Sequence, residues 1–513
     1  MSDHHRSAAA VLRLAPAESV TPPLSLPSSI RTGAVPWTLV SAALYIGVAL
    51  AVHFVQLGNP VLHVDEEFYL LVAHHMREGA VPFIDIWDRK PPGLFLLYRL
   101  FLLLPGDGVL TYQLCGIAAC AGTALVIERL AQQIAGPASA RLAGLAYVLF
   151  MPVFCYGIGQ APVFYNLLVA LAAVYTLQAW RSQASTPLLI NGAKAMALIG
   201  LAIQIKYTVV FEGAGFGLAL LLRGHAMRMP TDRLLRHGLA WCSLALAPTL
   251  AVFAAYAAFG HAELFLQSNV FSIMLRRADG MASWNRLASE MLALTPFWIA
   301  LGIAARTQVA DSDALKLLRW WGALSFAAFL AFGSWYDHYV TPVLVPLCVL
   351  AAPSLSLASV RGRRWSIAML GFGLIACIVV IADNIRRHGT REQAETIATA
   401  IDGELRGGCA FVFDGEPAFY RMANSCLPSR YAFPNHLNTW TEARALDVDP
   451  NLEVARIMMT RPDVVVTAEW WPFYLPNWET RAIVTDFLQR GYERYASVRM
   501  GTHQYGLWRR RRT

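Results

Sequence analysis

Charged residues are scarce in this chain of 513 residues. Asp, Glu, Lys and Arg together make up 15% of the sequence, whereas a soluble protein of ordinary composition carries roughly 25%. Hydrophobic residues reach 56%. This balance excludes a water-soluble globular enzyme as a description of the whole chain, and it excludes a disordered protein as well. The composition indicates a polytopic α-helical membrane protein.

Lysine and cysteine are also rare. The only lysines among the 42 basic residues are Lys90, Lys194, Lys206 and Lys316. Such a preference for arginine is typical of a GC-rich genome and favours a bacterial source. Six of the eight cysteines lie in apolar runs, where we expect them to pack in the core. Cys409 and Cys426 share a polar region instead, and the sequence leaves open whether they form a disulfide or stay free.

Apolar runs long enough to cross a membrane recur through most of the chain. Residues 1–33 are rich in Pro, Ser and Ala and are predicted to form a disordered cytoplasmic tail. Residues 34–383 are predicted to form a transmembrane domain of about 11 helices. The expected spans are at about 36–57, 109–132, 138–157, 161–180, 188–204, 207–222, 237–259, 287–305, 319–334, 338–357 and 365–383.

Basic connectors predict which segments lie on each side of the membrane. The most basic connectors are Arg223–Arg236, Arg306–Arg319 and Arg361–Arg364. The positive-inside rule places them in the cytoplasm together with the N-terminus, which is consistent with an odd number of crossings. The segments then left outside are a first outer loop over 58–108, a second over 260–286, and everything from 384 onward. The apolar stretch Gly93–Leu104 is too short to cross and carries Arg99, so we expect a helix along the outer membrane surface.

The composition becomes polar after residue 383. Amphipathic stretches alternate with short apolar ones over 384–513, which favours a small soluble α/β domain on the periplasmic side. The expected helices are 392–405, 453–460 and 481–490, and the expected strands are 410–413, 464–467 and 493–499. The region contains no GxGxxG or P-loop motif, so the sequence gives no support for nucleotide binding.

The first outer loop concentrates polar residues beside the predicted membrane edge. It contains His63-Val-Asp65-Glu66-Glu67-Phe-Tyr69 and then Trp87-Asp88-Arg89-Lys90-Pro91-Pro92-Gly93. Apolar residues between these segments follow helical spacing, which predicts a short interfacial helix with Asp65 at its N-terminus. Polar groups next to a bilayer are costly, so the whole cluster indicates a functional site. The simpler alternative is a solvated loop in which Asp65 only caps the helix.

This loop resembles the first outer loop of GT-C fold glycosyltransferases. It is most similar to the bacterial branch related to protein O-mannosyltransferases and the lipid A aminoarabinose transferase. The residues that carry the resemblance are Asp65-Glu66, Tyr69, Gly79, Val81-Pro82, Asp85, Asp88-Arg89-Lys90-Pro91-Pro92-Gly93 and Tyr98. Further matches are Gln160–Asn166, Ile205-Lys206-Tyr207 and Tyr336-Asp337-His338-Tyr339. The resemblance covers about 36–383 and implies a GT-C fold enzyme that transfers a sugar from a polyprenyl-phosphate donor with inversion.

The resemblance also implies roles for single residues. Asp65 occupies the position of the general base, and Glu66 that of a neighbouring acid that orients the acceptor. Lys90 corresponds to the basic residue that neutralises the donor phosphate, to which His338 and Tyr339 would donate hydrogen bonds. For His338 and Tyr339 the alternative is an ordinary polar helix start at the membrane interface. Because an apolar surface raises the pKa of a nearby carboxylate, we expect a raised pKa at Asp65.

The chain departs from the aminoarabinose-transferase pattern three residues after Asp65, where Phe68 stands in place of an arginine. One phosphate contact must then come from elsewhere, or the donor differs. Arg276 and Arg277 are the candidates, in a segment that would close over the donor as a lid. A loosely ordered loop that meets lipid headgroups is the alternative. The remaining residues expected to bind substrate are Tyr69, Asp85 and Asp88.

The sequence therefore predicts a glycosyltransferase of the bacterial inner membrane. It would move a sugar from a donor such as an undecaprenyl-phosphate sugar to a hydroxyl of a periplasmic glycolipid, polysaccharide or protein. A transporter or flippase for a lipid-linked sugar is the alternative, although the polar residues gather at one membrane edge and not at the midplane. No cofactor, metal or nucleic-acid partner is predicted, since HExxH and cysteine clusters are lacking. A divalent ion shared by Asp65, Asp85 and the phosphate stays open.

Overall fold

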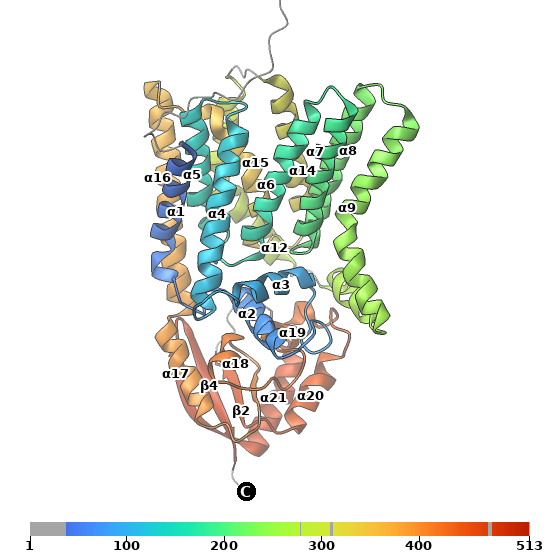
Figure 1. Cartoon of the computed structure of the whole chain (residues 1–513). Helices are drawn as coiled ribbons and strands as arrows, with labels where there is room; N and C mark the ends of the chain where they lie inside the picture. The colour runs from blue at the N-terminus through green and yellow to red at the C-terminus, as the bar shows by residue number, and fades with distance from the viewer. Residues whose placement is uncertain (1–36, 278, 308–310, 470–474, 512–513) are drawn as a thin grey trace, which may run out of the picture.

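The computed structural model describes residues 37–277, 279–307, 311–469 and 475–511. The predicted tail over 1–33 lies outside these residues. A helical bundle forms one half of the molecule and a smaller region around a β-sheet forms the other (Figure 1). Two short helices from the first outer loop lie between the two halves.

Nine helices of the described chain are long and apolar enough to cross a membrane. They are α1 (Trp37–His53), α4 (Val109–Ala131), α5 (Pro137–Phe154), α6 (Ala161–Trp180), α7 (Ser185–Ile203), α8 (Val210–Ala226), α9 (Thr231–Ala258), α14 (Ser312–Ala331) and α16 (Val360–His388). The protein is therefore a multi-pass membrane protein.

The remaining two expected spans have shorter or broken counterparts. Helices α12 (Met281–Ala293) and α13 (Thr295–Ala304) pass the same test only as a pair, bent by 46°. The break falls just before Pro296, which lies in the first turn of α13 and cannot continue the ladder of the preceding helix. The last is a short apolar helix made of α15 (Thr341–Ala351) and η5 (Ala352–Ser354).

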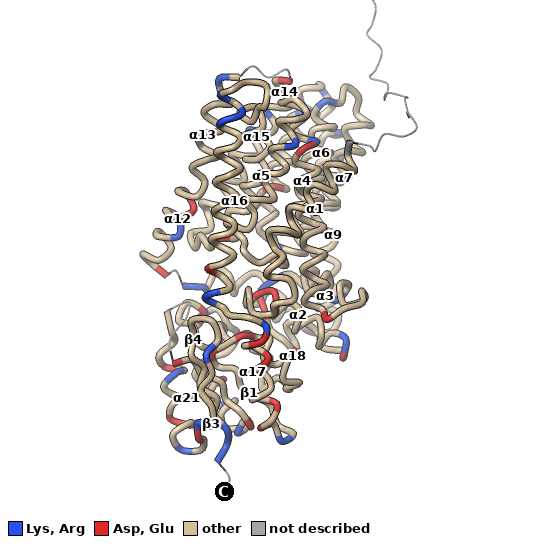
Figure 2. Tube along the Cα trace, turned by 90° about the vertical axis from the view of Figure 1, so that its left-hand side faces the viewer, with Lys and Arg blue, Asp and Glu red and all other residues tan. Residues whose placement is uncertain are grey.

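The surface of the bundle is apolar where lipid would surround it. Leu239 and Leu250 of α9 are 68% and 57% exposed, although they are large apolar residues. Charged residues are sparse along the helices and gather towards the ends of the bundle and in the sheet-containing half (Figure 2). This distribution fits a bilayer around the bundle, because lipid accepts apolar side chains and not charges.

The outer-loop segments are mostly helical. Helix α2 (Val64–Arg77) and helix α3 (Pro92–Phe101) form at the end of the bundle next to the sheet, and α3 lies across that end without crossing (Figure 1). The segment 260–286, expected to be a loop, contains α10 (Ala262–Leu266), the π-helix η3 (Gln267–Phe271) and α11 (Ser272–Leu275) before α12 begins.

The C-terminal region is built on a four-stranded sheet of order β1-β2-β4-β3. Its strands are β1 (Ala410–Val412), β2 (Val464–Ala468), β3 (Tyr492–Met500) and β4 (His503–Arg510). Its helices are α17 (Arg391–Asp402), α18 (Ala418–Met422), α19 (Pro434–Asn438), α20 (Pro450–Met459) and α21 (Trp478–Gly491). Strands β1 and β2 are parallel, and the other neighbours are antiparallel. The sequence prediction missed β4, and α16 runs five residues past the expected boundary at 383.

Both faces of this sheet are covered. Val464 and Val466 of β2 point into the core that also contains α17, while Val465 faces α20 and α21. Trp87 of the first outer loop inserts into the second of these cores. Cys409 and Cys426 form a disulfide, which decides between the two alternatives that the sequence left open. The C-terminal region is therefore packed directly against the loop that carries the candidate site.

Candidate active site

The start of helix α2 places Asp65. The backbone N–H of Asp65 donates a hydrogen bond of 3.2 Å to Nδ1 of His63, the residue that caps the helix. A cap of this kind satisfies one of the N–H groups left free in the first turn. Asp65 lies in that first turn, as the sequence predicted, where the helix dipole stabilises negative charge.

The Pro-Pro-Gly motif places Lys90. Helix α3 begins at Pro92, since a proline in the first turn costs no hydrogen bond. A Cβ on Gly93 would lie 2.5 Å from the Cβ of Gln204, so only glycine allows α3 to approach the end of α7 this closely. The motif therefore fixes the backbone that directly follows Lys90, over Pro91–Gly93.

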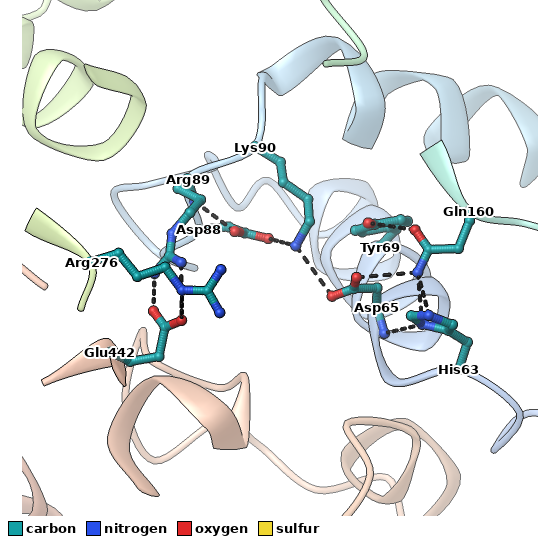
Figure 3. Close-up of polar contacts among 9 residues, drawn as sticks. All are labelled: His63, Asp65, Tyr69, Asp88, Arg89, Lys90, Gln160, Arg276 and Glu442. Carbon is teal, nitrogen blue, oxygen red and sulfur yellow. Dashed lines mark hydrogen bonds and ion pairs between the residues drawn. The ribbon is translucent and has the colours of Figure 1, made fainter. Parts of the chain in front are cut away.

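These two segments bring three predicted residues together (Figure 3). Nζ of Lys90 lies 3.3 Å from Oδ1 of Asp65 and 3.2 Å from Oδ2 of Asp88. The side chains of Lys90 and Asp65 are 15% and 16% exposed, and that of Asp88 is 2% exposed. Asp65 and Lys90 are thus in direct contact and mostly, but not completely, buried. We call Asp65, Asp88 and Lys90 the acid–lysine cluster.

The electrostatics of Asp65 differ from the expectation. Burial alone would raise the pKa of its carboxyl, but the positive charge of Lys90, the nearby His63 and His338, and a hydrogen bond from Gln160 act against burial. The net result is a pKa well below the usual range of aspartate. The predicted raised pKa is therefore wrong, because the prediction considered the apolar surroundings of Asp65 and not the charge of Lys90.

A second layer of side chains orients Asp65. Nε2 of Gln160 donates to Oδ2 of Asp65 at 3.2 Å, and the hydroxyl of Tyr69 donates to Oε1 of Gln160 at 3.4 Å. The ring of Tyr69, a predicted substrate contact, is buried and lies 5.1 Å from Nζ of Lys90. Tyr69 therefore supports both charged groups of the pair.

Glu66 faces away from Asp65, into the protein core. Its Oε1 accepts a hydrogen bond of 2.9 Å from the backbone N–H of Gly159. Burial is the main reason that the pKa of Glu66 is raised to about 8, so this carboxyl is mostly protonated at neutral pH. In the structure Glu66 therefore stabilises the turn before α6 and lies outside the acid–lysine cluster. The next residue, Glu67, pairs with Arg421 of α18 at 2.9 Å.

His338 and Tyr339 line a pocket within the bundle. They lie in η4 (Asp337–Tyr339), and the ring of His338 is 6.2 Å from that of His63. Lys206 also lines the pocket, with Nζ 5.1 Å from the ring of Tyr339. Burial would raise the pKa of Tyr339, but the positive charges of Lys206, Arg276 and Arg89 together outweigh it, so the net pKa falls. Burial together with Lys206 holds the pKa of His338 well below its usual value.

The other predicted residues lie at the edge of the site. Arg276 pairs with Glu442 of the C-terminal region at 2.8 Å (Figure 3), and the backbone N–H of Arg277 donates to the carbonyl of Thr441 at 3.1 Å. These contacts fix both arginines, which differs from a loosely ordered loop. The carboxylate of Asp85 accepts from the backbone N–H of Val81 at 2.7 Å in a local turn, and the structure shows no bond from it to the acid–lysine cluster.

Metal binding gains no support among the residues that the structure describes. They contain no group of three or more His, Cys, Asp or Glu side chains placed to hold an ion. Nζ of Lys90 lies within ion-pair distance of the carboxylates of both Asp65 and Asp88.

Sequence reasoning did not assign a role to Gln160, Lys206 or Glu442. The first two stood in motifs that carried the family resemblance, and Lys206 is one of only four lysines, so a signal was present. Glu442 stands in no recognisable motif. Its importance follows only from the packing of the C-terminal region against the first outer loop.

No protein-family model matches this sequence, and no curated protein matches it. Solved structures do match. ArnT from Cupriavidus metallidurans in the apo state superposes with a TM-score of 0.59 at 14% identity, covering 92% of this chain and 97% of that chain. The same protein bound to undecaprenyl phosphate gives 0.57 at 15% identity, covering 92% and 98%.

A more distant match is the archaeal oligosaccharyltransferase AglB from Archaeoglobus fulgidus, in complex with an inhibitory peptide and a dolichol-phosphate. Its TM-score is 0.52 at 10% identity, covering 84% of this chain and 69% of that chain. At such low identities the likeness concerns the fold. The chain therefore has the GT-C fold that its first outer loop predicted, with a C-terminal region around a small sheet.

Proposed function

We propose that this protein is a glycosyltransferase of the bacterial inner membrane. It moves a sugar from a polyprenyl-phosphate donor to a hydroxyl of a periplasmic acceptor, which is a glycolipid, a polysaccharide or a protein. The observation that carries the proposal is the buried pair of Asp65 and Lys90 at the membrane edge of a GT-C fold. The undecaprenyl phosphate and dolichol-phosphate bound to the structural neighbours support the donor class.

The reaction is a single inverting displacement. Asp65 accepts the proton of the acceptor hydroxyl while that oxygen attacks the anomeric carbon of the sugar. The bond between this carbon and the phosphate oxygen breaks, and the polyprenyl phosphate leaves with the electron pair and one more negative charge. Lys90 stabilises this charge as it develops, and Arg276 and Lys206 provide further cations nearby.

The ion pair between Asp65 and Lys90, as it stands before the donor binds, is compatible with this mechanism. A base must be ionised before it accepts a proton, and Lys90 keeps the pKa of Asp65 low. When the donor phosphate attracts Lys90, the lysine interacts less with Asp65. The pKa of Asp65 then rises towards the range in which a carboxylate accepts a proton more readily. Donor binding thus prepares the base.

The pocket that contains Lys206, His338 and Tyr339 is the proposed place for the donor headgroup. It lies between membrane helices, and Phe329, Phe332, Pro342 and also Glu212 line it together with these three residues. The ring of His338 is 6.2 Å from that of His63, which caps the helix of Asp65. Such a pocket suits a sugar phosphate attached to a lipid, because the lipid stays among apolar helices while the phosphate meets cations.

A complementation experiment tests the proposal. Cells that lack the gene receive wild type, Asp65→Asn or Asp313→Asn, and the masses of their envelope lipids, polysaccharides and glycoproteins are compared. Asp313 is an exposed aspartate at the other end of the bundle that also pairs with a lysine. We expect wild type and Asp313→Asn to restore a sugar-bearing product and Asp65→Asn to fail at equal membrane abundance.

Two outcomes would contradict the proposal. Restoration of the product by Asp65→Asn would remove Asp65 as the base. A lipid-linked sugar that crosses the membrane in the presence of the protein, while no acceptor gains a sugar, would favour a flippase.

A further inference from the structure

Glu442 of the C-terminal region joins three segments that are far apart in the sequence. It lies at the end of η6 (Trp440–Glu442) and its side chain is 6% exposed. Its two carboxylate oxygens accept hydrogen bonds from both terminal nitrogens of Arg89, and Oε1 lies 2.8 Å from Nε of Arg276. Figure 3 shows the two arginines converging on this one carboxylate.

Both arginines lie next to the proposed phosphate site. Arg89 directly precedes Lys90 in the chain, so fixing its guanidinium also limits the movement of Lys90. The terminal nitrogens of Arg276 point away from Glu442, towards the side on which Lys90 and Asp65 lie (Figure 3). One of these nitrogens, Nη2, donates to the hydroxyl of Tyr336 at 2.8 Å. Tyr336 is two residues before His338, and their rings are stacked.

Contacts beside Glu442 strengthen the same connection. The backbone N–H of Arg277 donates to the carbonyl of Thr441, and the guanidinium of Arg277 lies 4.5 Å from the ring centre of Trp440. Residues 440–442 thus hold both Arg276 and Arg277. An arginine fixed in advance loses less side-chain entropy when it binds an anion than one that moves freely.

We propose that Glu442 is a positioning residue for the donor phosphate, which makes the C-terminal region a working part of the donor site. This inference rests on the proposed function. Glu442 directs Arg276 towards the phosphate and fixes Arg89 beside Lys90, without touching the donor itself. Two guanidinium groups share one carboxylate, so a net positive charge remains for an anion.

The charge state of Glu442 supports this role. Burial would raise the pKa of its carboxyl, but the two arginines lower it well below the usual range of glutamate. Glu442 is therefore ionised at every pH at which the enzyme is expected to work. The ion pairs between Glu442 and the arginines therefore persist over this pH range, whereas an ion pair formed by a histidine requires the histidine to be protonated.

Binding of undecaprenyl phosphate to the purified full-length protein in nanodiscs tests the inference. The variants are Glu442→Gln, Glu442→Asp and Lys90→Ala, with Glu453→Gln as the matched control. Glu453 is also a largely buried glutamate of the C-terminal region that pairs with an arginine, Arg456, at 2.6 Å. We expect Glu442→Gln to raise Kd about tenfold and Glu453→Gln to leave it unchanged. Glu442→Asp keeps the charge and is expected to give an intermediate Kd, because the shorter side chain does not reach both arginines.

A double-mutant cycle separates positioning from a general structural effect. Because Glu442 acts through Arg276 as well as Arg89, the variant that combines Glu442→Gln with Arg276→Gln is expected to lose less affinity than the sum of the two single losses. Additive losses in this cycle, or wild-type binding in both Glu442→Gln and Glu442→Asp, would overturn the inference. In either case, weakened binding in Lys90→Ala would keep the proposed function intact. Unchanged binding in Lys90→Ala as well would overturn both. Should Glu442→Gln fail to fold, wild-type binding by Glu442→Asp is sufficient to overturn the inference.

Discussion

Each end of the helical bundle carries an ion pair between a lysine and an aspartate, and the two pairs differ in their surroundings. Lys316 and Asp313, at the start of α14, are 3.0 Å apart, with side chains 69% and 64% exposed. Lys90 and Asp65 are slightly farther apart, at 3.3 Å, yet are only 15% and 16% exposed. The distance between the charged atoms is therefore a poor guide to the role of an ion pair. Water screens the first pair, whereas the second acts in a medium of lower dielectric constant.

The comparison separates structural from chemical roles. An exposed pair contributes about 0–1 kcal/mol to stability. A buried pair costs desolvation energy to form and is a weak source of net stability. The burial of Asp65, Asp88 and Lys90 together therefore needs another reason, and the proposed function offers one, which is charge stabilisation during sugar transfer.

The largest expected effect is on catalysis at the buried pair. In the proposed mechanism Lys90 is the cation beside the leaving phosphate, so Lys90→Ala should slow sugar transfer by about 10²–10³-fold, the usual cost of losing one group that stabilises transition-state charge. Lys316→Ala is the matched control and should keep the wild-type rate. The measurement is the rate of sugar transfer by equal amounts of purified protein. Equal rates in the two variants would mean that burial of the lysine has no catalytic purpose.

The second prediction extends the comparison to stability. Arg421→Ala leaves the fully buried carboxyl group of Glu67 without its charged partner, and should lower the free energy of unfolding by about 3 kcal/mol. Arg236→Ala breaks the Asp232–Arg236 pair, whose side chains are 71% and 70% exposed, and should cost less than about 0.5 kcal/mol. Denaturation in detergent, followed for both variants, measures the difference. Similar losses would show that water screens the two pairs alike.

The smallest effect concerns pH and the neighbour of Asp65. The pKa of Glu66 is raised in the folded protein from 4.5 to about 8, so between these values the folded chain binds a proton that the unfolded chain has released. Stability then falls as pH rises through this window. Glu66→Gln cannot titrate, so its stability relative to wild type should increase by roughly 1 kcal/mol from pH 6 to pH 7. Denaturation at the two pH values tests this, and an opposite slope would mean that Glu66 is ionised in the fold.

How well the sequence predicts a contact depends on how far apart the two residues lie along the chain. Asp65, Asp88 and Lys90 lie within one loop, and the Pro-Pro-Gly motif and the helix start fix their positions locally. Their grouping could therefore be predicted. Glu442 is separated from Arg89 by 353 positions, and no local pattern links them, so this contact could not. The resemblance of the first outer loop supplied the GT-C fold, which helix lengths alone do not specify.

Two errors show what local patterns leave out. The sign of the pKa shift at Asp65 depends on the charge of a lysine 25 positions away, whereas the prediction considered only the apolar neighbourhood. Strand β4 was missed because its end is rich in arginine and resembles a solvated tail. In the fold, Arg509 instead pairs with Glu404 and Glu493, which lie in neighbouring segments of the C-terminal region.

The ratio of sugar-transfer rates between Asp65→Asn and Asp313→Asn, measured with purified protein and saturating donor, tests the central claim most directly. Both substitutions remove one negative charge opposite a lysine, and asparagine preserves the shape of the side chain. The account predicts that Asp65→Asn is at least about 10²-fold slower, as expected for the loss of a general base, while Asp313→Asn transfers sugar at the wild-type rate. Equal rates in the two variants would contradict it.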